Sequence, residues 1–514
     1  MKRYFLGIDI GTFESRGILI DESFRVAADA SLPHGMDNPQ PGWFEQEAEA
    51  VWWGDLCKLC RTLIKQSGIR PEQIACVGTS ALGTDCLPVD EQCRPLRPAI
   101  LYGIDARASE EAAWLTEHYG QARVQELFGH PICSGDTATK ILWLRRHEPE
   151  IYAKTAYFLT GSSFLTARLT GKYVIDQSLA KGSFRPLYQA DGSVNEAECG
   201  LYCRPNQIAA CAWSTDIVGT VTPEAAAQTG LAAGTPVITG TGDSTAEAIS
   251  VGLVEPGTAF FQYGSSMFYY YCTDRFVGSY VSPQGNGTLK GGKAFTVPGT
   301  YCLGDGTNAA GTLTRWVRDL LYSKELDAEK QGGENAYAVM AREAAAVPPG
   351  SDGLIMLPYI YGERSPLQDA EATGMLFGLK GTHGRAQINR AALEAVGYST
   401  YQHLLLFEEL GVPPRRIITA GGGTKNAAWM QIICDMAGMP LTIPEPFQCS
   451  SYGDAMLAAL GVGALESFAA LRAALPQGRI LQPDRKNHEF YQEHYPIFRD
   501  LYLENRDRMH RMQK

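Results

Sequence analysis

The chain has 514 residues, of which 45% are hydrophobic and 20% are charged, and its formal net charge is −11. A chain of this length and composition divides into about two globular domains. The negative charge and the lack of a strong basic run argue against nucleic acid and anionic membrane as partners, and no stretch approaches the roughly 18 apolar residues that a membrane span needs.

The first residues predict a cytoplasmic protein. Three residues, two of them basic, precede the first strand, which soon carries an aspartate, so the segment does not fit a signal peptide. Thirteen cysteines, an odd number, indicate reduced thiols. The pair Cys57 and Cys60 lies in a helical pattern without a second pair, which favours core thiols. The nine histidines show no HxxxH or HExxH spacing, so no metal is assigned to them.

Residues 4–21 predict a strand, a tight turn and a second strand. The first strand ends near Asp9, and the turn contains Gly11 and Thr12. Backbone N–H groups, a hydroxyl and a carboxylate then share one tip, a set that suits a nucleotide phosphate with its magnesium. An ordinary hairpin with glycine at its turn is the open alternative.

The next segments alternate helix, strand and polar loop. Residues 42–65 lead into an amphipathic helix, residues 74–77 form a buried strand, and the loop 83–85 follows. A strand at 95–101 precedes Asp105 and Arg107, which could bind polyol hydroxyls or pair with each other. Residues 109–170 are mostly helical, and residues 186–214 are rich in loops.

Asp243, near the midpoint, lies where a strand ends and a helix begins. Residues 236–239 predict the strand, Gly240 and Gly242 turn the chain, and the helix runs from Ser244 to Gly252. Ligand crevices of open α/β sheets form at this position, and the start of a helix favours an ionised carboxylate. The alternative is that residues 244–247 form only a capping box.

The second half opens with a strand, a turn at Gly264 and Ser265, and a strand, over residues 258–271. This repetition predicts two similar domains that clamp a nucleotide between them, joined near residues 252–257. Helices are expected from Gly311, over 386–410, from Ala427 and from Asn487, with strands at 354–359 and 417–420.

Taken in order, these stretches resemble the FGGY carbohydrate kinases of the sugar-kinase, actin and heat-shock-protein superfamily. The resemblance covers residues 4–462 and rests on these motifs: Asp9-Ile-Gly-Thr12 with Arg16, Trp43-Phe-Glu45-Gln46, Leu96-Arg-Pro-Ala-Ile-Leu101, Gly242-Asp243, Leu357-Pro-Tyr359 with Gly362-Glu-Arg364, and Gly421-Gly-Gly423 with Asn426. It implies an α/β fold of two actin-like (ribonuclease H-like) domains, residues 1–252 and 253–514, with an ATP and sugar cleft between them.

The resemblance also implies a role for each matched residue. Asp243 corresponds to the catalytic base, and Asp9 and Asp243 to the carboxylates near magnesium. The nucleotide-binding positions are Gly11, Thr12, Arg16, Gly264, Ser265, Gly311, Gly422, Gly423 and Asn426. The sugar-contact loop departs from the family, because Gly83 and Thr84 stand where xylulokinases have Met-His and glycerol kinases have Arg-Glu. We therefore expect Asp85, Tyr102 or both to contact the substrate; the alternative is that Asp85 caps a turn and faces solvent.

The resemblance is strongest to xylulokinase-like members. It implies ATP-dependent phosphorylation of a sugar hydroxyl with ATP and Mg²⁺, with a pentulose such as xylulose as the first candidate substrate. Two alternatives stay open, a kinase of another ketose or polyol and a catalytically silent sugar or nucleotide sensor of the same fold. The expected partner is a small-molecule sugar or polyol, without nucleic acid or membrane, and a homodimer remains an option.

Overall fold

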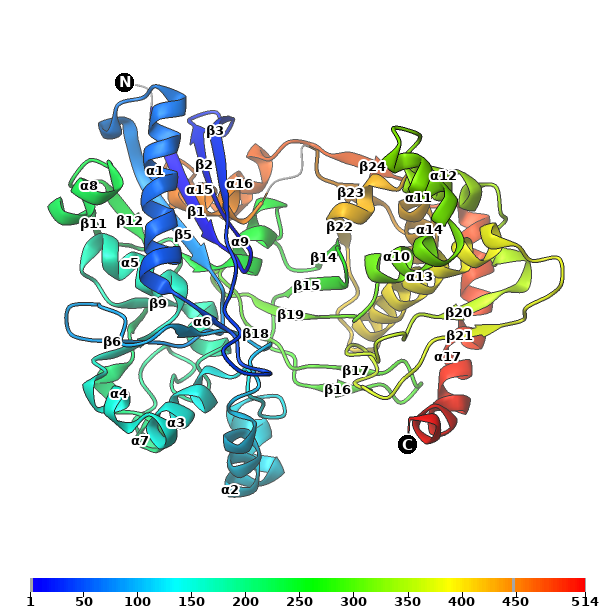
Figure 1. Ribbon diagram of the computed structural model, residues 1–514, viewed down its shortest axis with the longest axis horizontal. Helices are drawn as coiled ribbons and strands as arrows, with labels where there is room; N and C mark the ends of the chain where they lie inside the picture. The colour runs from blue at the N-terminus through cyan, green and yellow to red at the C-terminus, as the bar shows by residue number, and fades with distance from the viewer. Residues whose placement is uncertain (1–2, 446–448, 514) are drawn as a thin grey trace.

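The computed structural model describes residues 3–445 and 449–513, and its two lobes are each built on a mixed β-sheet (Figure 1). The first sheet has the order β11-β12-β5-β1-β2-β3, with β13 beside β5. Strands β1 to β3 are antiparallel, whereas β5 and β12 run parallel to β1. The bounds are β1 Tyr4–Ile10, β2 Glu14–Asp21, β3 Val26–Pro33, β5 Ile74–Ala81, β11 Ile217–Thr220, β12 Pro236–Ile238 and β13 Thr241–Gly242.

The second sheet repeats this topology. Its order is β18-β19-β15-β14-β22-β23-β24, in which β14, β15 and β19 are antiparallel and β22 and β23 run parallel to β14. An antiparallel strand closes the same edge of each sheet, β11 in the first and β24 in the second. The bounds are β14 Thr258–Tyr263, β15 Met267–Thr273, β18 Lys293–Ala294, β19 Tyr301–Gly306, β22 Arg416–Ala420, β23 Leu441–Ile443 and β24 Arg479–Leu481. The internal repeat predicted from the two hairpins is confirmed.

Helices cover both faces of each sheet. The side chains of β1 alternate, so that Leu6 and Ile8 lie in one core with α1 (Gly54–Ser67), while Phe5 lies in another. The second core joins the two lobes through α9 (Asp243–Ser250) and α15 (Ser450–Gly461). On the outer side of the second sheet lie α10 Gly311–Leu321, α12 Ala336–Ala345, α13 Arg385–Glu409, α14 Ala427–Ala437 and α17 Arg485–Met512.

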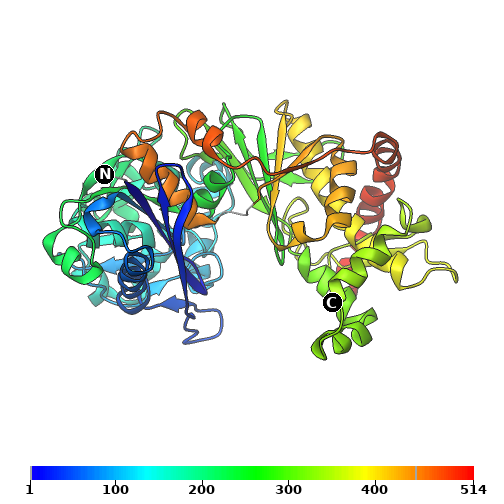
Figure 2. The same cartoon turned by 90° about the horizontal axis from the view of Figure 1, so that it is seen from above.

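The helix α15 comes from the second half of the chain but packs on the first sheet, beside α16 (Phe468–Ala474), as the orange helices near the blue strands show (Figure 2). Glycines permit this contact: a Cβ at Gly7 of β1 would lie 1.8 Å from the Ser451 carbonyl oxygen, and one at Gly453 would lie 1.9 Å from that of Ala246. The domain limit between residues 252 and 253 stays a prediction.

Most local predictions are confirmed, and two differ. The strand expected over 95–101 is only β7 (Ala99–Ile100), because the prolines at 95 and 98 cannot donate to a ladder. The helix expected through residue 65 begins as a π-helix over Ala48–Trp53 before α1.

All thirteen cysteines are free, and Cys57 and Cys60 are buried. Within the described ranges, no helix is both long and apolar enough to cross a bilayer.

Candidate active site

The carboxyl ends of three neighbouring strands bring the central residues together. Asp9 of β1 is paired in register with Ser80 of β5, and Ser80 is paired with Thr241 of β13, two residues before Asp243. Asp243 is the first residue of α9 and is partly exposed. The structure therefore places Asp9 and Asp243 at the edge where open α/β sheets bind ligands.

The capping-box alternative for residues 244–247 is wrong. The residue that caps α9 is Gly242, without a side-chain cap, and Ser244 lies inside the helix. Its backbone N–H donates to Asp243 Oδ1 at 2.6 Å, and Glu247 Oε1 instead accepts from Gln262 Nε2 of the second lobe, also at 2.6 Å. Asp243 and Glu247 are four residues apart and share one face of α9.

Three carboxyl groups at this place repel one another. Burial raises the pKa of Asp243, and burial together with the Asp243 charge raises the pKa of Asp9 to about 8 and that of Glu247 to about 7. Among the residues that the structure describes, no group of three or more His, Cys, Asp or Glu side chains is arranged to hold a metal. Mg²⁺ is typically bound through one or two carboxylates and substrate phosphates, so Asp9 and Asp243 fit that ion only together with a phosphate.

The first hairpin is closed by a hydrogen bond within its own turn and is also held from outside by Gln46. Gly11 N–H donates to Glu14 O at 3.0 Å, and Gln46 Nε2 donates to Thr12 O at 2.8 Å. The Thr12 hydroxyl lies 3.1 Å from that of Tyr102, so one nucleotide candidate and one sugar candidate meet. Arg16, by contrast, points its side chain away from the turn: its Nη2 donates to Asp29 Oδ2 at 3.3 Å.

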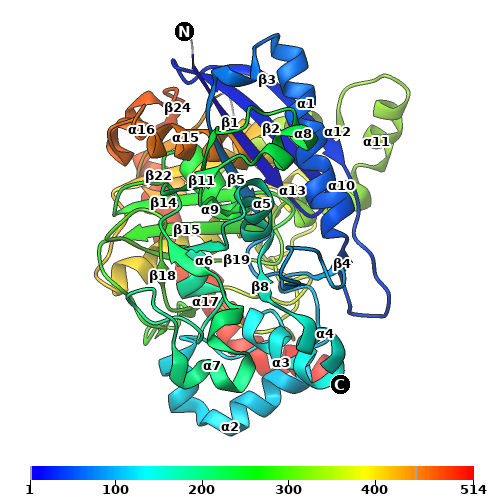
Figure 3. The ribbon, with the colours of Figure 1, turned by 90° about the vertical axis from the view of Figure 1, so that its left-hand side faces the viewer.

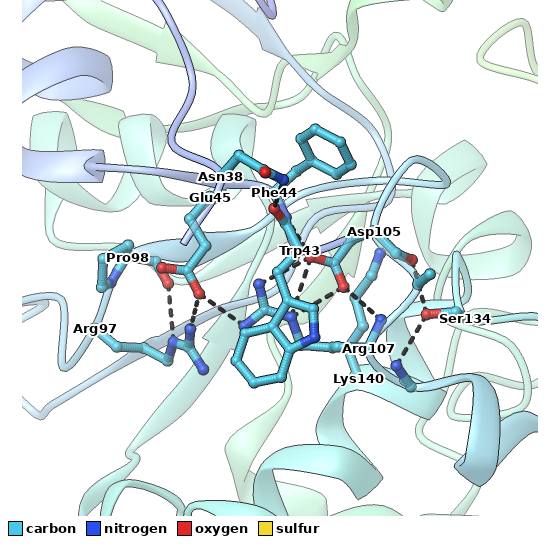
Figure 4. Close-up of polar contacts among 12 residues, drawn as sticks. Asn38, Trp43, Phe44, Glu45, Arg97, Pro98, Asp105, Arg107, Ser134 and Lys140 are labelled. Atoms are coloured by element: carbon cyan, nitrogen blue, oxygen red, sulfur yellow. Dashed lines mark hydrogen bonds and ion pairs between the residues drawn. The ribbon is translucent and has the colours of Figure 1, made fainter. Parts of the chain in front are cut away.

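A buried ionic network supports the loop that carries Tyr102 (Figure 4). Arg107 Nη2 donates to Asp105 Oδ2 at 2.8 Å and its Nη1 to Glu45 Oε1 at 2.7 Å. Its guanidinium also lies 4.2 Å from the centre of the Trp43 ring. Of the two interpretations of Asp105 and Arg107, the structure favours mutual pairing. The network fixes the loop, and both side chains are already occupied.

The loop 83–85 is divided between two environments. A Cβ at Gly83 would lie 3.2 Å from Leu179, which also approaches Gly242 beside Asp243. Asp85, however, is fully buried, and its Oδ2 accepts from Gly161 N–H at 3.0 Å, at the start of α5 (Gly161–Thr170). Burial raises its pKa to about 8. Asp85 thus does not face solvent, and its contact with substrate stays a prediction.

The Thr84 carbonyl oxygen accepts a hydrogen bond from Lys140 Nζ at 2.5 Å. Lys140 is fully buried, and its Nζ also donates to Gly135 O at 2.9 Å. This lysine was not predicted as a site residue. Its bonds to two carbonyl oxygens tie the predicted sugar-contact loop to Gly135.

The predicted nucleotide positions of the second lobe line one cavity with a volume of about 460 Å³. Beside the cavity, position 421 requires glycine: its φ is 92°, and a Cβ there would lie 2.6 Å from the Tyr263 carbonyl oxygen. Asn426 caps α14 by accepting from Trp429 N–H at 3.0 Å. The predicted nucleotide-binding residues that line this cavity are Gly264, Ser265, Gly311, Gly422, Gly423 and Asn426.

Lys293 of β18 lies near Asp243 and was not predicted from the sequence. Its stem packs on Gly182 of the first lobe, and its Nζ donates to the Tyr270 hydroxyl at 3.4 Å. That hydroxyl lies 3.0 Å from Ser244 Oγ, next to Asp243. No sequence motif surrounds Lys293, so only the fold brings this ammonium to the junction of the lobes.

Comparison with known proteins gives consistent matches over the whole chain. The family model "FGGY family of carbohydrate kinases, N-terminal domain" matches residues 4–250, and the corresponding C-terminal domain model matches residues 263–462. The xylulose kinase of Escherichia coli K12 is 29% identical, over 97% of this chain and 98% of that protein. The gluconokinase of Bacillus subtilis 168 is 28% identical, over 98% and 96%. The crystal structure of xylulose kinase from Rhodospirillum rubrum aligns with a TM-score of 0.88 and 28% identity, over 99% and 100%.

Proposed function

Because the chain belongs to the FGGY family of carbohydrate kinases and has its two-domain, actin-like ATPase fold, it is a sugar kinase of an ATP-using family, and we propose that its acceptor is a ketose. A pentulose such as xylulose is the first candidate. The observation that carries the proposal is the placement of Asp243 at the first residue of α9, beside Asp9 and next to the sugar-contact loop.

The residues then divide the work of phosphoryl transfer, which depends mainly on positioning and charge neutralisation. Asp243 orients the attacking hydroxyl and accepts its proton as the new bond forms. The backbone N–H groups of the two hairpins, at Gly11–Thr12 and Gly264–Ser265, hold the phosphates. Asp9 and Asp243 would hold Mg²⁺, which when bound neutralises charge on the phosphates.

The small loop at residues 83 and 84 and the nearby Tyr102 support a compact, neutral acceptor. A second candidate, a sugar acid, is favoured by Lys293. Among the described residues its ammonium makes one hydrogen bond, at 3.4 Å to Tyr270, so it retains donors for a carboxylate. The names of the relatives support both classes, since xylulose kinases and gluconokinases match at nearly equal identity.

ATP turnover by the purified protein, with a panel of pentuloses, aldonates and polyols, tests the proposal. We expect strong stimulation by one ketose and little by polyols. Preference for an aldonate would favour the second candidate. Turnover that no sugar stimulates would contradict a kinase and favour the silent sensor, provided that nucleotide binding is intact.

A further inference from the structure

Asp454 lies on α15, the helix that reaches the first sheet from the second half of the chain (Figure 3). Its side chain is fully buried, and its Oδ2 lies 2.7 Å from Ser80 Oγ. The same Oγ lies 2.7 Å from Asp9 Oδ1. Ser80 is also fully buried, so the three side chains form a chain of hydrogen bonds that ends at the partly exposed Asp9.

The number of hydrogens determines the state of this chain. A serine hydroxyl has one proton, so Ser80 can donate to only one of the two carboxyl groups. The other group must then carry a proton and donate to Ser80. Because Asp9 corresponds to the family's magnesium carboxylate, it takes the ionised role once a cation is present, and Asp454 takes the protonated one.

The surroundings of Asp454 agree with a neutral acid. Its Oδ1 has no hydrogen-bond partner among the described residues. An ionised carboxylate buried without a partner is costly, whereas a protonated one is much less so. Burial and the neighbouring Asp9 charge raise the pKa of Asp454 well above its ordinary value.

We propose that Asp454 is a positioning residue: as a neutral acid it donates to Ser80, and Ser80 in turn donates to Asp9 and fixes the orientation of that carboxylate. This inference rests on the proposed function, in which Asp9 helps to hold the metal–nucleotide complex. Groups that orient a metal ligand typically contribute 10–100-fold to metal affinity or activity. The orientation of Asp9 then depends on a helix from the other end of the chain.

Mn²⁺ binding to the full-length protein in the presence of ADP, followed by electron paramagnetic resonance, tests the proposal without requiring the sugar. Asp454→Ala and Ser80→Ala should each weaken Mn²⁺ binding by about 10–100-fold. Asp454→Asn should bind Mn²⁺ nearly as well as the unchanged protein, because its amide can donate to Ser80 as a protonated acid does. The double variant should be no weaker than Ser80→Ala alone, because both changes break one chain.

Tyr452→Phe is the matched control, since the Tyr452 hydroxyl joins the same helix to Phe24 O at 2.9 Å and lies outside the Asp9 chain. It should lower the melting temperature but leave Mn²⁺ affinity unchanged. If Asp454→Asn is as harmful as Asp454→Ala, Asp454 acts as an anion and the proposal is wrong. Unchanged Mn²⁺ affinity in every variant would make Asp454 a packing residue only. Neither result depends on the sugar panel, so a failure of this proposal can be told apart from a failure of the proposed function.

Discussion

At the scale of single residues, the test of the catalytic assignment is Asp243→Asn. Asparagine can still accept the 2.6 Å hydrogen bond from Ser244 N–H, so α9 should keep its start. Loss of the base should lower sugar phosphorylation by about 10²–10⁴-fold. Calorimetry without magnesium should show nearly unchanged nucleotide binding, and the melting temperature should not fall. A variant with normal turnover would remove Asp243 from the chemistry.

Lys293 provides a test of substrate class. Lys293→Met keeps much of the stem that packs on Gly182 but removes the ammonium. If a sugar acid binds there, kcat/KM for that acid should fall by about 10–100-fold, as expected for the loss of a charge-assisted hydrogen bond, while neutral ketoses change little. Lys290→Met is the control, because Lys290 pairs with Asp305 at 3.1 Å. Equal losses on acids and neutral sugars would argue against selection by Lys293.

At the scale of elements, two neighbouring glycines after β22 separate ligand contact from fold. A Cβ at Gly422 meets no protein atom within 4 Å, whereas Gly421 has a φ of 92° and no room beside Tyr263 O. Gly422→Val should therefore weaken ATP binding with little loss of stability. Gly421→Ala should destabilise the protein, by roughly 1 kcal/mol or more, because an alanine backbone is strained at this positive φ. Nucleotide titration and thermal unfolding of both variants check this, and unchanged ATP affinity in Gly422→Val would exclude the turn from the site.

The local elements could be predicted because their signals are local. The two hairpins that turn at Gly11 and Gly264 have strand-like segments on each side of a glycine turn, and α13 has a long helical pattern. The capping-box prediction at 244–247 failed because Gly242 is the residue that caps α9, so Ser244 lies two residues too far into the helix to be the cap. Whether Asp105 bound a sugar or Arg107 could not be decided without the packing of Trp43 around the pair.

Contacts between distant parts of the chain left no such signal. Ser80 and Asp454 are 374 positions apart, and neither lies in a motif that predicts the other. Lys293 likewise reaches the first lobe from a short edge strand. The family resemblance therefore predicted only site residues that lie in sequence motifs. The residues that orient them could be found only from the tertiary fold.

At the scale of the whole molecule, the buried acids predict how stability depends on pH. Burial is the first cause that raises the pKa of Asp9, Asp85 and Glu363 to about 8 and that of Glu247 to about 7. The folded protein therefore binds more protons than the unfolded chain, and stability should fall as pH rises through 7 and 8. Each kcal/mol lost should lower the melting temperature by about 2–4 °C.

Thermal unfolding from pH 6 to 9 without nucleotide measures this decline. Asp85→Asn should reduce the slope, because one raised pKa is removed. MgCl₂ with ATP should restore stability at high pH, since a cation and its nucleotide stabilise the ionised carboxylates by binding the folded state. A melting temperature that rises with pH would contradict the assignment of these acids as neutral in the ligand-free protein.

The packing of α15 on the first sheet also has a consequence during synthesis. The strand Tyr4–Ile10 leaves the ribosome early, but the helix that covers its inner face, Ser450–Gly461, is made at the other end of the message. At about 5–20 residues per second, this face waits on the order of half a minute or more for its cover. A nascent chain, or a fragment that stops at residue 252, would expose Phe5 and its neighbours and would be a client for chaperones until the late helix arrives.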